Sequence, residues 1–286
     1  MKRLLMTGCL LVLTACTNLD AVRDISHRLS TASMAWDDVG GEFANSCIRE
    51  SSINPLLSDC DLEKKASAGL AGANQVLGNY FKALRESADN SNFTIQPGLD
   101  QAAAAAAGIP GIDTKQVTAI SGLVGLLSKL ATGAIREATL RELIEQGGPS
   151  AQIVVRGLDD LVVTRLGRRL ETERFQLTGQ FGRLLLAQKE TVGPDPSTLC
   201  SGSAASKFSG VGFLLTLEYC RRLGVIDNRV NALAAYRSSL AVADKALAEM
   251  QSSKTKLKAK ALAQKLFEVG VDLDDKVAAI RKAFGR

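Results

Sequence analysis

The chain has 286 residues, of which 46% are hydrophobic and 23% charged, a composition typical of a folded globular protein and not of a disordered one. Its single histidine, His27, excludes metal sites that need two histidines and argues against His-Cys zinc clusters. Aromatic residues are scarce, with nine Phe, three Tyr and one Trp, which argues against a stacking platform for single-stranded nucleic acid or sugars.

The first 16 residues have the pattern of a targeting segment. Lys2 and Arg3 precede an apolar stretch over 4–13, which is shorter than the about 20 residues that span a bilayer. The stretch ends in Leu13-Thr14-Ala15-Cys16, which resembles the lipobox of bacterial lipoproteins. The resemblance implies that 1–15 is a signal peptide and that Cys16 carries the lipid, a diacylglyceryl group on sulfur with an acyl chain such as palmitate on nitrogen. An ordinary secretory signal with a chance cysteine is the alternative.

Removal of the signal leaves 16–286, which we expect to be a single periplasmic helical domain with possible sub-parts 17–148 and 149–286. The formal net charge falls from +5 to +3 because Lys2 and Arg3 are lost, and so weak a field does not imply a nucleic-acid partner. Thr17 stands where an Asp marks inner-membrane lipoproteins, so the resemblance implies an outer-membrane protein that faces the periplasm. Several acyl chains would anchor it firmly to the membrane.

Four cysteines remain in the mature chain, and an even number in an exported protein predicts two disulfides. Three pairings are possible. The local pairing is favoured because Cys47 and Cys60, and likewise Cys200 and Cys220, are neighbours in two separate regions of the chain. A metal site is the alternative, but the spacings are long and no histidine is near, so we expect no metal ligands.

Six prolines divide the chain, and between them the apolar spacing is helical. A helix is expected over 20–34, almost directly after the lipid, in a region that Gly40-Gly41 ends. A disulfide-pinned loop over 45–61 follows, and Asp61 is the expected N-cap of a helix over 64–88. The apolar stripe of that helix consists of Leu70, Asn74, Leu77, Phe81, Leu84 and Ala88.

The middle of the chain predicts three more helices. Six alanines over 102–107 favour a short one. Asp113 or Thr114 is expected to cap a helix that runs to about Gln146, where Gly147-Gly148-Pro149-Ser150 stops it. Ser150 then caps the next, which runs to about Glu190. A loop is expected over 191–203.

Two helices are expected after the last proline, over 204–223 and 227–269, and Asp272 or Asp274 caps a final one that ends near Phe284. The long one has an apolar seam with the alternating step of a coiled coil, broken by Lys254, and should pack antiparallel to the 150–190 helix. The seam consists of Leu233, Tyr236, Leu240, Ala243, Leu247, Met250 and Leu257.

The predicted fold class is all-α: an elongated antiparallel helical bundle with long coiled-coil-like helices and two disulfide-pinned loops. No internal repeat is convincing.

Acidic pairs are the first candidates for acid–base chemistry. Neighbouring residues of a helix point about 100° apart, so the members of each pair do not share a face and a solvated surface is expected. The pairs are Asp37-Asp38, Asp159-Asp160 and Asp274-Asp275.

Other candidate motifs are weaker still. Gly69-Leu70-Ala71-Gly72 does not resemble a phosphate loop, and Ser201-Gly202-Ser203 has only the composition of a loop. His27 lies beside Arg28 on the first predicted helix and should be exposed. We therefore expect no catalytic residues and no cofactor.

Five lysines form a basic run in the predicted 227–269 helix and could contact anionic lipid headgroups or lipopolysaccharide. On a helix they would spread round the axis, so a solvated face is the preferred interpretation. They are Lys254, Lys256, Lys258, Lys260 and Lys265.

The segment 117–135 carries one charge, Lys129, together with Gly122, Gly125 and Gly133, which permit close helix contact. One interpretation is a membrane-inserting segment that forms a hairpin with 102–112, as in α-helical pore-forming toxins. The other is the central helix of a bundle, apolar all round because it is surrounded. We favour the second because Lys129 would be costly in mid-membrane.

Taken together, these patterns predict a lipid-anchored, non-enzymatic envelope protein. Its helical body is expected to be a scaffold or adaptor that binds another envelope protein or the cell-wall layer, and not nucleic acid. The alternative is a membrane-active helical protein that uses 117–135. An enzyme is less favoured because no catalytic constellation is present.

Overall fold

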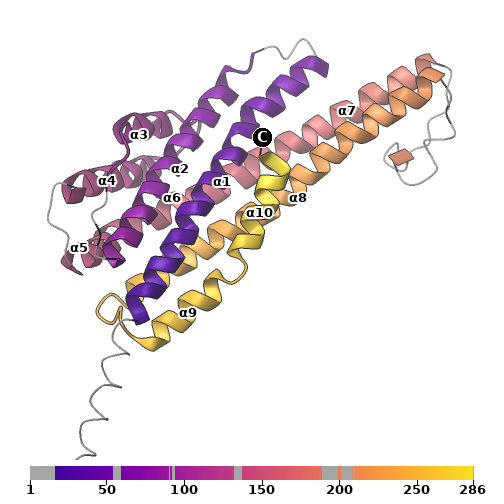
Figure 1. Cartoon of the computed structure of the whole chain (residues 1–286). Helices are drawn as coiled ribbons and strands as arrows, with labels where there is room; N and C mark the ends of the chain where they lie inside the picture. The colour runs from indigo at the N-terminus through magenta and orange to yellow at the C-terminus, as the bar shows by residue number, and fades with distance from the viewer. Residues whose placement is uncertain are drawn as a thin grey trace, which may run out of the picture.

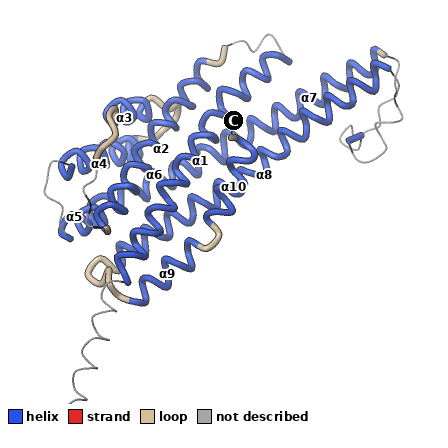
Figure 2. Tube along the Cα trace, in the orientation of Figure 1, coloured by secondary structure: helices blue, strands red, loops and turns tan. Residues whose placement is uncertain are grey.

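The computed structural model of the chain describes residues 17–53, 59–89, 91, 94–131, 137–188, 199–200, 208 and 210–285. Helices, turns and short loops make up these residues, which contain no strand (Figure 2). The prediction of an all-α bundle is therefore confirmed, and the helices lie side by side in an elongated body (Figure 1).

The first two helices, α1 (Thr17–Ile53) and α2 (Asp61–Ala88), pack against each other along their lengths. The disulfide Cys47–Cys60 joins them, with the two Cα atoms 5.8 Å apart. Cys47 lies inside α1 and Cys60 directly precedes α2, so the predicted loop over 45–61 is too long. The bond ties two helix ends together because the last turn of α1 continues past the cysteine.

The prediction that Gly40-Gly41 ends the first helical region is wrong, since α1 continues through both glycines. Ser67 of α2 donates a 2.9 Å hydrogen bond to the Gly40 carbonyl and accepts one of 3.1 Å from the Ala44 amide. The hydroxyl thus bridges two backbone groups that are helical partners. A Cβ on Gly40 would lie 3.1 Å from the Leu70 Cβ, so the missing side chain lets α2 approach closely.

On one side of α2 lie α3 (Leu99–Ala107) and α4 (Thr114–Ala131). A Cβ on Gly72 would collide with the backbone carbonyl of Ala102, so the short alanine helix sits directly on a glycine of α2. Asp113 caps α4 as predicted, because its Oδ1 accepts a 2.8 Å hydrogen bond from the Gln116 amide.

The large apolar residues of α4 face the bundle, while Ser121, Gly122, Gly125 and Ser128 are exposed. The expectation of a helix surrounded on all sides is therefore wrong, because α4 lies at the side of the bundle with an outward face of small and polar residues. Residues 132–136, which include Gly133, lie outside the described part. The buried residues are Ala119, Ile120, Leu123, Val124, Leu126, Leu127 and Leu130.

The predicted stop at 147–150 is also wrong. Helices α5 (Glu137–Glu142), α6 (Gly148–Leu161) and α7 (Gly167–Ala187) form one continuous run, joined by π-helical turns at Leu143–Gly147 and Val162–Leu166. Pro149 lies in the first turn of α6, where a proline is tolerated. A Cβ on Gly147 would lie 2.6 Å from the Tyr80 ring, so close packing explains this glycine better than termination does.

The chain returns through α8 (Gly210–Ser252), which has 43 residues and is about 65 Å long. The predicted gap between 223 and 227 is absent, and the break falls instead over 253–259, where the seam spacing fails at Lys254. Then follow α9 (Lys260–Gly270) and α10 (Leu273–Phe284). All seven predicted seam residues are buried, and α8 packs on α6 and α7 as expected.

Helices α9 and α10 pack against α1 and α8, while the far ends of α7 and α8 project beyond the body as a two-helix hairpin (Figure 1). Among the described helices, none is long and apolar enough to cross a membrane. All of the contacts described lie within 17–285, so a chain that lacks residues 1–16 retains them.

Candidate functional site

The projecting α7–α8 hairpin is the most distinctive surface of the described chain. Its inner seam is closed by Leu177, Phe181 and Leu185 on α7, and the Phe181 ring stacks on Tyr219 of α8 with centroids 4.2 Å apart. The second predicted disulfide, Cys200–Cys220, attaches the preceding chain to α8, with Cα atoms 5.3 Å apart. The two helices of the hairpin are therefore held together by this seam, and the disulfide fixes Cys200 of the connection against α8.

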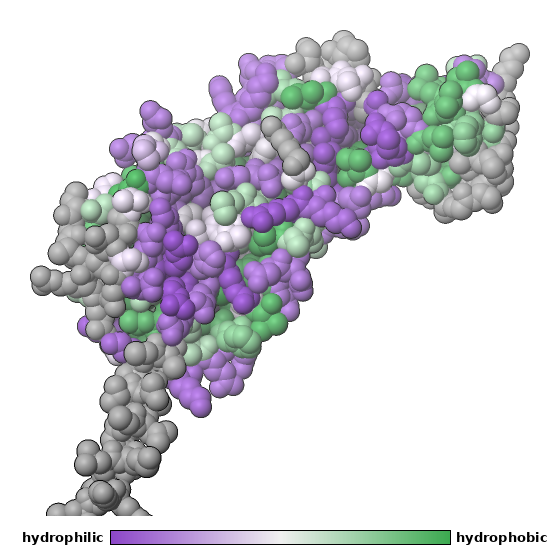
Figure 3. Space-filling model, in the orientation of Figure 1, coloured by the Kyte–Doolittle hydropathy of each residue, from purple (hydrophilic) through white to green (hydrophobic). Residues whose placement is uncertain are grey.

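The outer faces of the same hairpin are apolar, which is unusual for a solvated surface. Hydrophobic residues gather over the projecting end in the space-filling view (Figure 3). Phe175 is 80% exposed, Leu186 67% and Leu214 64%. The full set of exposed large apolar side chains on the hairpin is Phe175, Leu184, Leu186, Val211, Leu214 and Leu217.

On α7, two of these residues, Phe175 and Leu186, belong to a stripe with coiled-coil spacing. Phe175, Gly179, Gly182 and Leu186 follow one another at steps of four, three and four residues. A Cβ added to either glycine would have no neighbour within 4 Å. Such a stripe has the spacing with which another helix packs, and within the described chain nothing occupies it.

Positive charge borders the apolar faces. Arg183, Arg221 and Arg222 are exposed on the hairpin, against the single acidic residue Glu218 over 175–188 and 210–222. Hydrogen bonds from Arg221, with Nε 2.7 Å from the carboxylate, and from Arg222 lower the pKa of Glu218 to about 2. The carboxylate stays charged at neutral pH, so the hairpin end has a net charge of +2.

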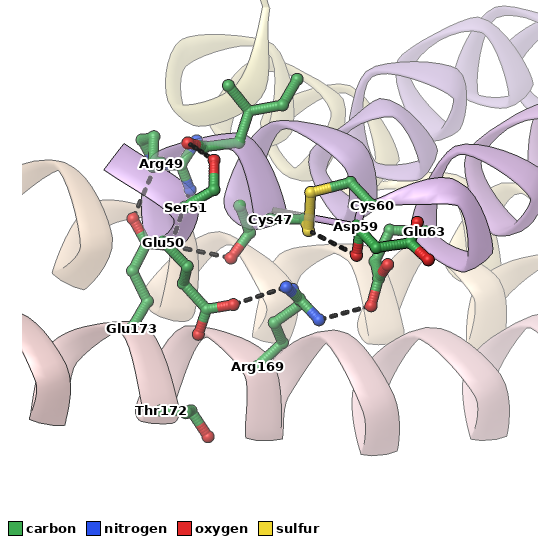
Figure 4. A network of polar contacts seen from close by, with 12 residues as sticks. Cys47, Arg49, Glu50, Ser51, Asp59, Cys60, Glu63, Arg169, Thr172 and Glu173 are labelled. Atoms are coloured by element: carbon green, nitrogen blue, oxygen red, sulfur yellow. Dashed lines mark hydrogen bonds and ion pairs between the residues drawn. A yellow bond between two sulfur atoms is a disulfide. The ribbon is translucent and has the colours of Figure 1, made fainter. Parts of the chain in front are cut away.

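A buried ion-pair network anchors the hairpin where it leaves the body (Figure 4). Glu173 of α7 is 2% exposed. Its carboxylate accepts hydrogen bonds from Arg49 Nε at 2.6 Å, from Arg49 Nη2 at 2.8 Å and from the Ser46 hydroxyl at 2.8 Å. Since Arg49 and Ser46 belong to α1, these bonds lock α7 to the first helix.

One turn earlier on α7, Arg169 lies between two carboxylates of different helices. It pairs with Glu50 of α1 and with Glu63 of α2, the latter at 2.6 Å (Figure 4). Burial raises the pKa of Glu50, and the neighbouring Arg169 charge opposes that rise. A single guanidinium therefore joins α1, α2 and α7 beside the Cys47–Cys60 disulfide.

The network extends to α8 through Glu42, which pairs with Arg49 and, at 3.2 Å, with Arg229. Burial raises the pKa of Glu42 and lowers that of Arg229. A pocket of about 220 Å³ adjoins the network, lined in part by Arg49, Leu177 and Arg222. Charges this deeply buried are stable only while their partners stay in place, so the network fixes the angle of the hairpin.

A second concave surface lies between α1 and α2 and has a volume of about 300 Å³. Asn74 lines it, is 2% exposed, and has neither amide atom in hydrogen-bond geometry. Burial raises the pKa of the neighbouring Asp37 to about 6, with a smaller opposing effect of the nearby Asn74 amide and a further rise from Asp38.

The remaining predicted site residues do not form a catalytic cluster. Cys16 lies outside the described residues. His27 is exposed as expected, with Arg85 Nη1 3.2 Å from its Nδ1. Asp159 pairs with Arg237 at 3.5 Å and Asp274 with Arg28 at 3.2 Å, so each of these two carboxylates lies in an ion pair with an arginine.

Within the described ranges, no group of three or more His, Cys, Asp or Glu side chains is placed to hold a metal ion. No protein-family model matches the chain, and no curated protein or solved structure is similar to it. The hairpin, the network and the N-terminal sequence are therefore the features that bear on function.

Sequence reasoning missed both the network and the exposed hairpin faces. Glu173 stands between Leu170 and Leu177 at core spacing, which was an available signal for a buried charge. Ile153 and Leu184 are apolar and stand next to the buried Val154 and Leu185, yet they are 41% and 44% exposed. Only the relative positions of the helices decide which of several apolar stripes on one helix is covered.

Proposed function

We propose that the chain is a lipid-anchored protein of the bacterial envelope, non-enzymatic, whose helical body holds the α7–α8 hairpin out to another envelope protein. The Leu13-Thr14-Ala15-Cys16 motif directly before α1 supports the anchor. The observation that carries the binding role is the exposed apolar surface of the hairpin, which a buried ion-pair network attaches to the body. The expected place is the outer membrane, on its periplasmic side.

The apolar stripe and the positive charge of the hairpin suggest the chemistry of the surface that its partner presents. The stripe from Phe175 to Leu186 has the spacing that accepts an apolar helix, and the net charge of +2 at the hairpin end favours an acidic rim around it. A protein with an apolar helical surface bordered by Asp and Glu fits both features.

The anchor is tested in the native host. Replacement of Cys16 by Ser should abolish labelling with a palmitate analogue and stop maturation. A Cys16→Ser protein that still takes up label and partitions into membranes like the wild type would contradict the anchor.

The binding role is tested by photo-crosslinking in intact cells. A photoreactive residue at Leu186 or Leu214 should form an adduct with one envelope protein. The same residue at Leu62, which is 64% exposed but lies on α2, should not. The identified protein, once purified, should bind the wild-type domain and lose that binding to Leu186→Asp/Leu214→Asp at unchanged melting temperature. Adducts only with lipid, or with a second copy of this chain, would overturn the proposal.

A further inference from the structure

The basic run of five lysines, which the sequence predicts to lie on one long helix, is arranged differently in the structure. Between Glu249 and Glu268 the chain has five lysines and no acidic residue. The first three lie in the connection over 253–259, which is not helical, and Lys260 begins α9. Lys256, Lys258 and Lys260 are exposed. Lys254, Lys256 and Lys258 are therefore not spread round a helix axis.

The connection is fixed in place. Leu257 is buried in the core between exposed lysines. The Lys256 amide donates a 2.7 Å hydrogen bond to the Ser253 carbonyl, and the Ala259 amide donates one of 2.9 Å to the Lys256 carbonyl. The lysines are thus carried on a defined turn that is attached by Leu257, and their charges are held together at one place on the surface.

That place is the end of the body where the N-terminal chain enters. Arg28 Nη1 of α1 donates a 3.0 Å hydrogen bond to the carbonyl of Gly270 at the end of α9. Asn18 lies ten residues before Arg28, in the first turn of α1, and Lys260 lies ten residues before Gly270, at the beginning of α9. Figure 1 shows both helices running the same way, with the α8–α9 connection beside the first turn of α1.

The neighbouring charges leave a positive surplus at this end. Lys254 pairs with Glu145 at 3.5 Å and Lys265 with Glu249 at 2.8 Å. The nearest acidic residues of α1, Asp20 and Asp24, both pair with Arg23, at 3.0 and 3.1 Å. Lys256 and Lys260, by contrast, make no ion pair with the part of the chain that the structure describes.

We propose that the lysine turn, 254–260, binds the anionic phospholipid headgroups of the leaflet that holds the Cys16 anchor. This rests on the proposed anchor. Cys16 directly precedes α1, so a lipid on Cys16 would bring the turn to the bilayer surface. Each lysine near an anionic surface raises membrane partitioning about fivefold. The two contacts together would orient the body and direct the α7–α8 hairpin away from the membrane.

The test uses residues 17–286, which retain every described contact and lack both the signal and Cys16. The partition coefficient is measured by sedimentation with vesicles of phosphatidylcholine containing 30% phosphatidylglycerol, and with phosphatidylcholine alone. We expect binding to the anionic vesicles only, weakening as salt rises. Lys256→Gln/Lys258→Gln/Lys260→Gln should lower it by at least about 25-fold, about fivefold each for Lys256 and Lys260. The matched control, Lys65→Gln/Lys115→Gln/Lys282→Gln, removes the same charge from elsewhere and should retain at least a third of it.

Three results would overturn the inference: no binding to anionic vesicles, equal binding to both kinds, or an equal loss in both triple variants. Melting temperatures of the two variants are compared first. If the turn variant proves unstable, Lys256→Gln/Lys260→Gln replaces it, with an expected loss of about 25-fold. A failed inference is distinguishable from a failed anchor, since acylation of Cys16 is scored in cells and vesicle binding is measured without Cys16.

Discussion

The indole N–H of Trp36 donates a 2.8 Å hydrogen bond to the hydroxyl of Ser239, and both side chains are completely buried. The bond joins α1 to α8, 203 residues apart in the chain. The Trp36 ring also makes edge contacts with Phe81 and Tyr236, with centroids 6.4 Å away in each case. The single tryptophan therefore reports directly on the centre of the bundle.

Replacing Ser239 by Ala should leave the indole N–H buried without a partner. We expect the free energy of unfolding to fall by about 1–3 kcal/mol. Urea unfolding followed by Trp36 fluorescence measures this. Ser252→Ala, at an exposed position of the same helix, should change the value by less than about 0.5 kcal/mol. Equal effects of the two substitutions would contradict the role of the hydrogen bond.

The ion-pair network predicts a large effect for a small change at Glu173. Glu173→Gln removes the buried charge that Arg49 faces and should cost about 2 kcal/mol, because the half-buried guanidinium loses one of its two carboxylate partners. Glu171→Gln, an exposed carboxylate two residues earlier, is the control and should be nearly neutral. Calorimetric melting of both variants checks this. A Glu173→Gln protein as stable as the wild type would mean that the network does not stabilise the attachment of α7 to α1.

Two glycines should respond in opposite directions to the same substitution. Gly72→Ala forces a Cβ into the backbone of Ala102 and should destabilise the protein by about 3 kcal/mol. Gly41→Ala places its Cβ where nothing lies within 4 Å, and should stabilise α1 by about 0.5–1 kcal/mol. Thermal melting of both variants is the measurement, and the same sign for both would refute the packing account.

The burial of α4 predicts how 117–135 responds to charge. Leu127→Asp buries an unpaired carboxylate and removes a fully buried leucine, so it should lower the free energy of unfolding by about 4 kcal/mol. Ser128→Asp, one residue later on the outward face, should be nearly neutral. If the segment inserts into membranes, the protein should instead release dye from vesicles, and Leu127→Asp should abolish release without changing the melting temperature. We expect no release.

Asp37 predicts a pH dependence of stability. Its pKa is raised to about 6 from 3.8, so the folded state binds the proton more tightly than the unfolded state does. That contribution is fully present below about pH 4 and is lost as the pH rises to about 6. Asp37→Asn should therefore gain stability over the wild type at pH 7 but not at pH 4. The gain should be about 1 kcal/mol, since partial exposure reduces the effect of the shift.

Melting temperatures at the two pH values measure the gain, and Asp100→Asn, an exposed acid on α3, should show none. A gain for Asp37→Asn that is the same at both pH values would contradict the titration of Asp37.

Local patterns in the sequence were sufficient for the fold class, both disulfide pairings and most of the core. The step of three and four residues from Leu233 to Met250 predicts the buried side of α8, because periodicity along one helix depends on that helix alone. The same holds for Asp113, whose capping role needs only the next three residues. Nearness in the chain likewise favoured Cys47–Cys60, since a short loop is easily closed.

Only the tertiary structure decided where helices end and which apolar faces stay uncovered. Gly40-Gly41 and Gly147-Gly148-Pro149 look like helix terminators in the sequence. In the structure, however, the Ser67 hydroxyl of α2 hydrogen-bonds the Gly40 carbonyl, and the Tyr80 ring of α2 packs directly on Gly147. The burial of Glu173 and the exposure of Leu214 depend on which helices lie beside them. Local propensity amounts to about 1 kcal/mol per residue, and contacts between helices exceed it, so these features follow from packing and not from the pattern along the chain.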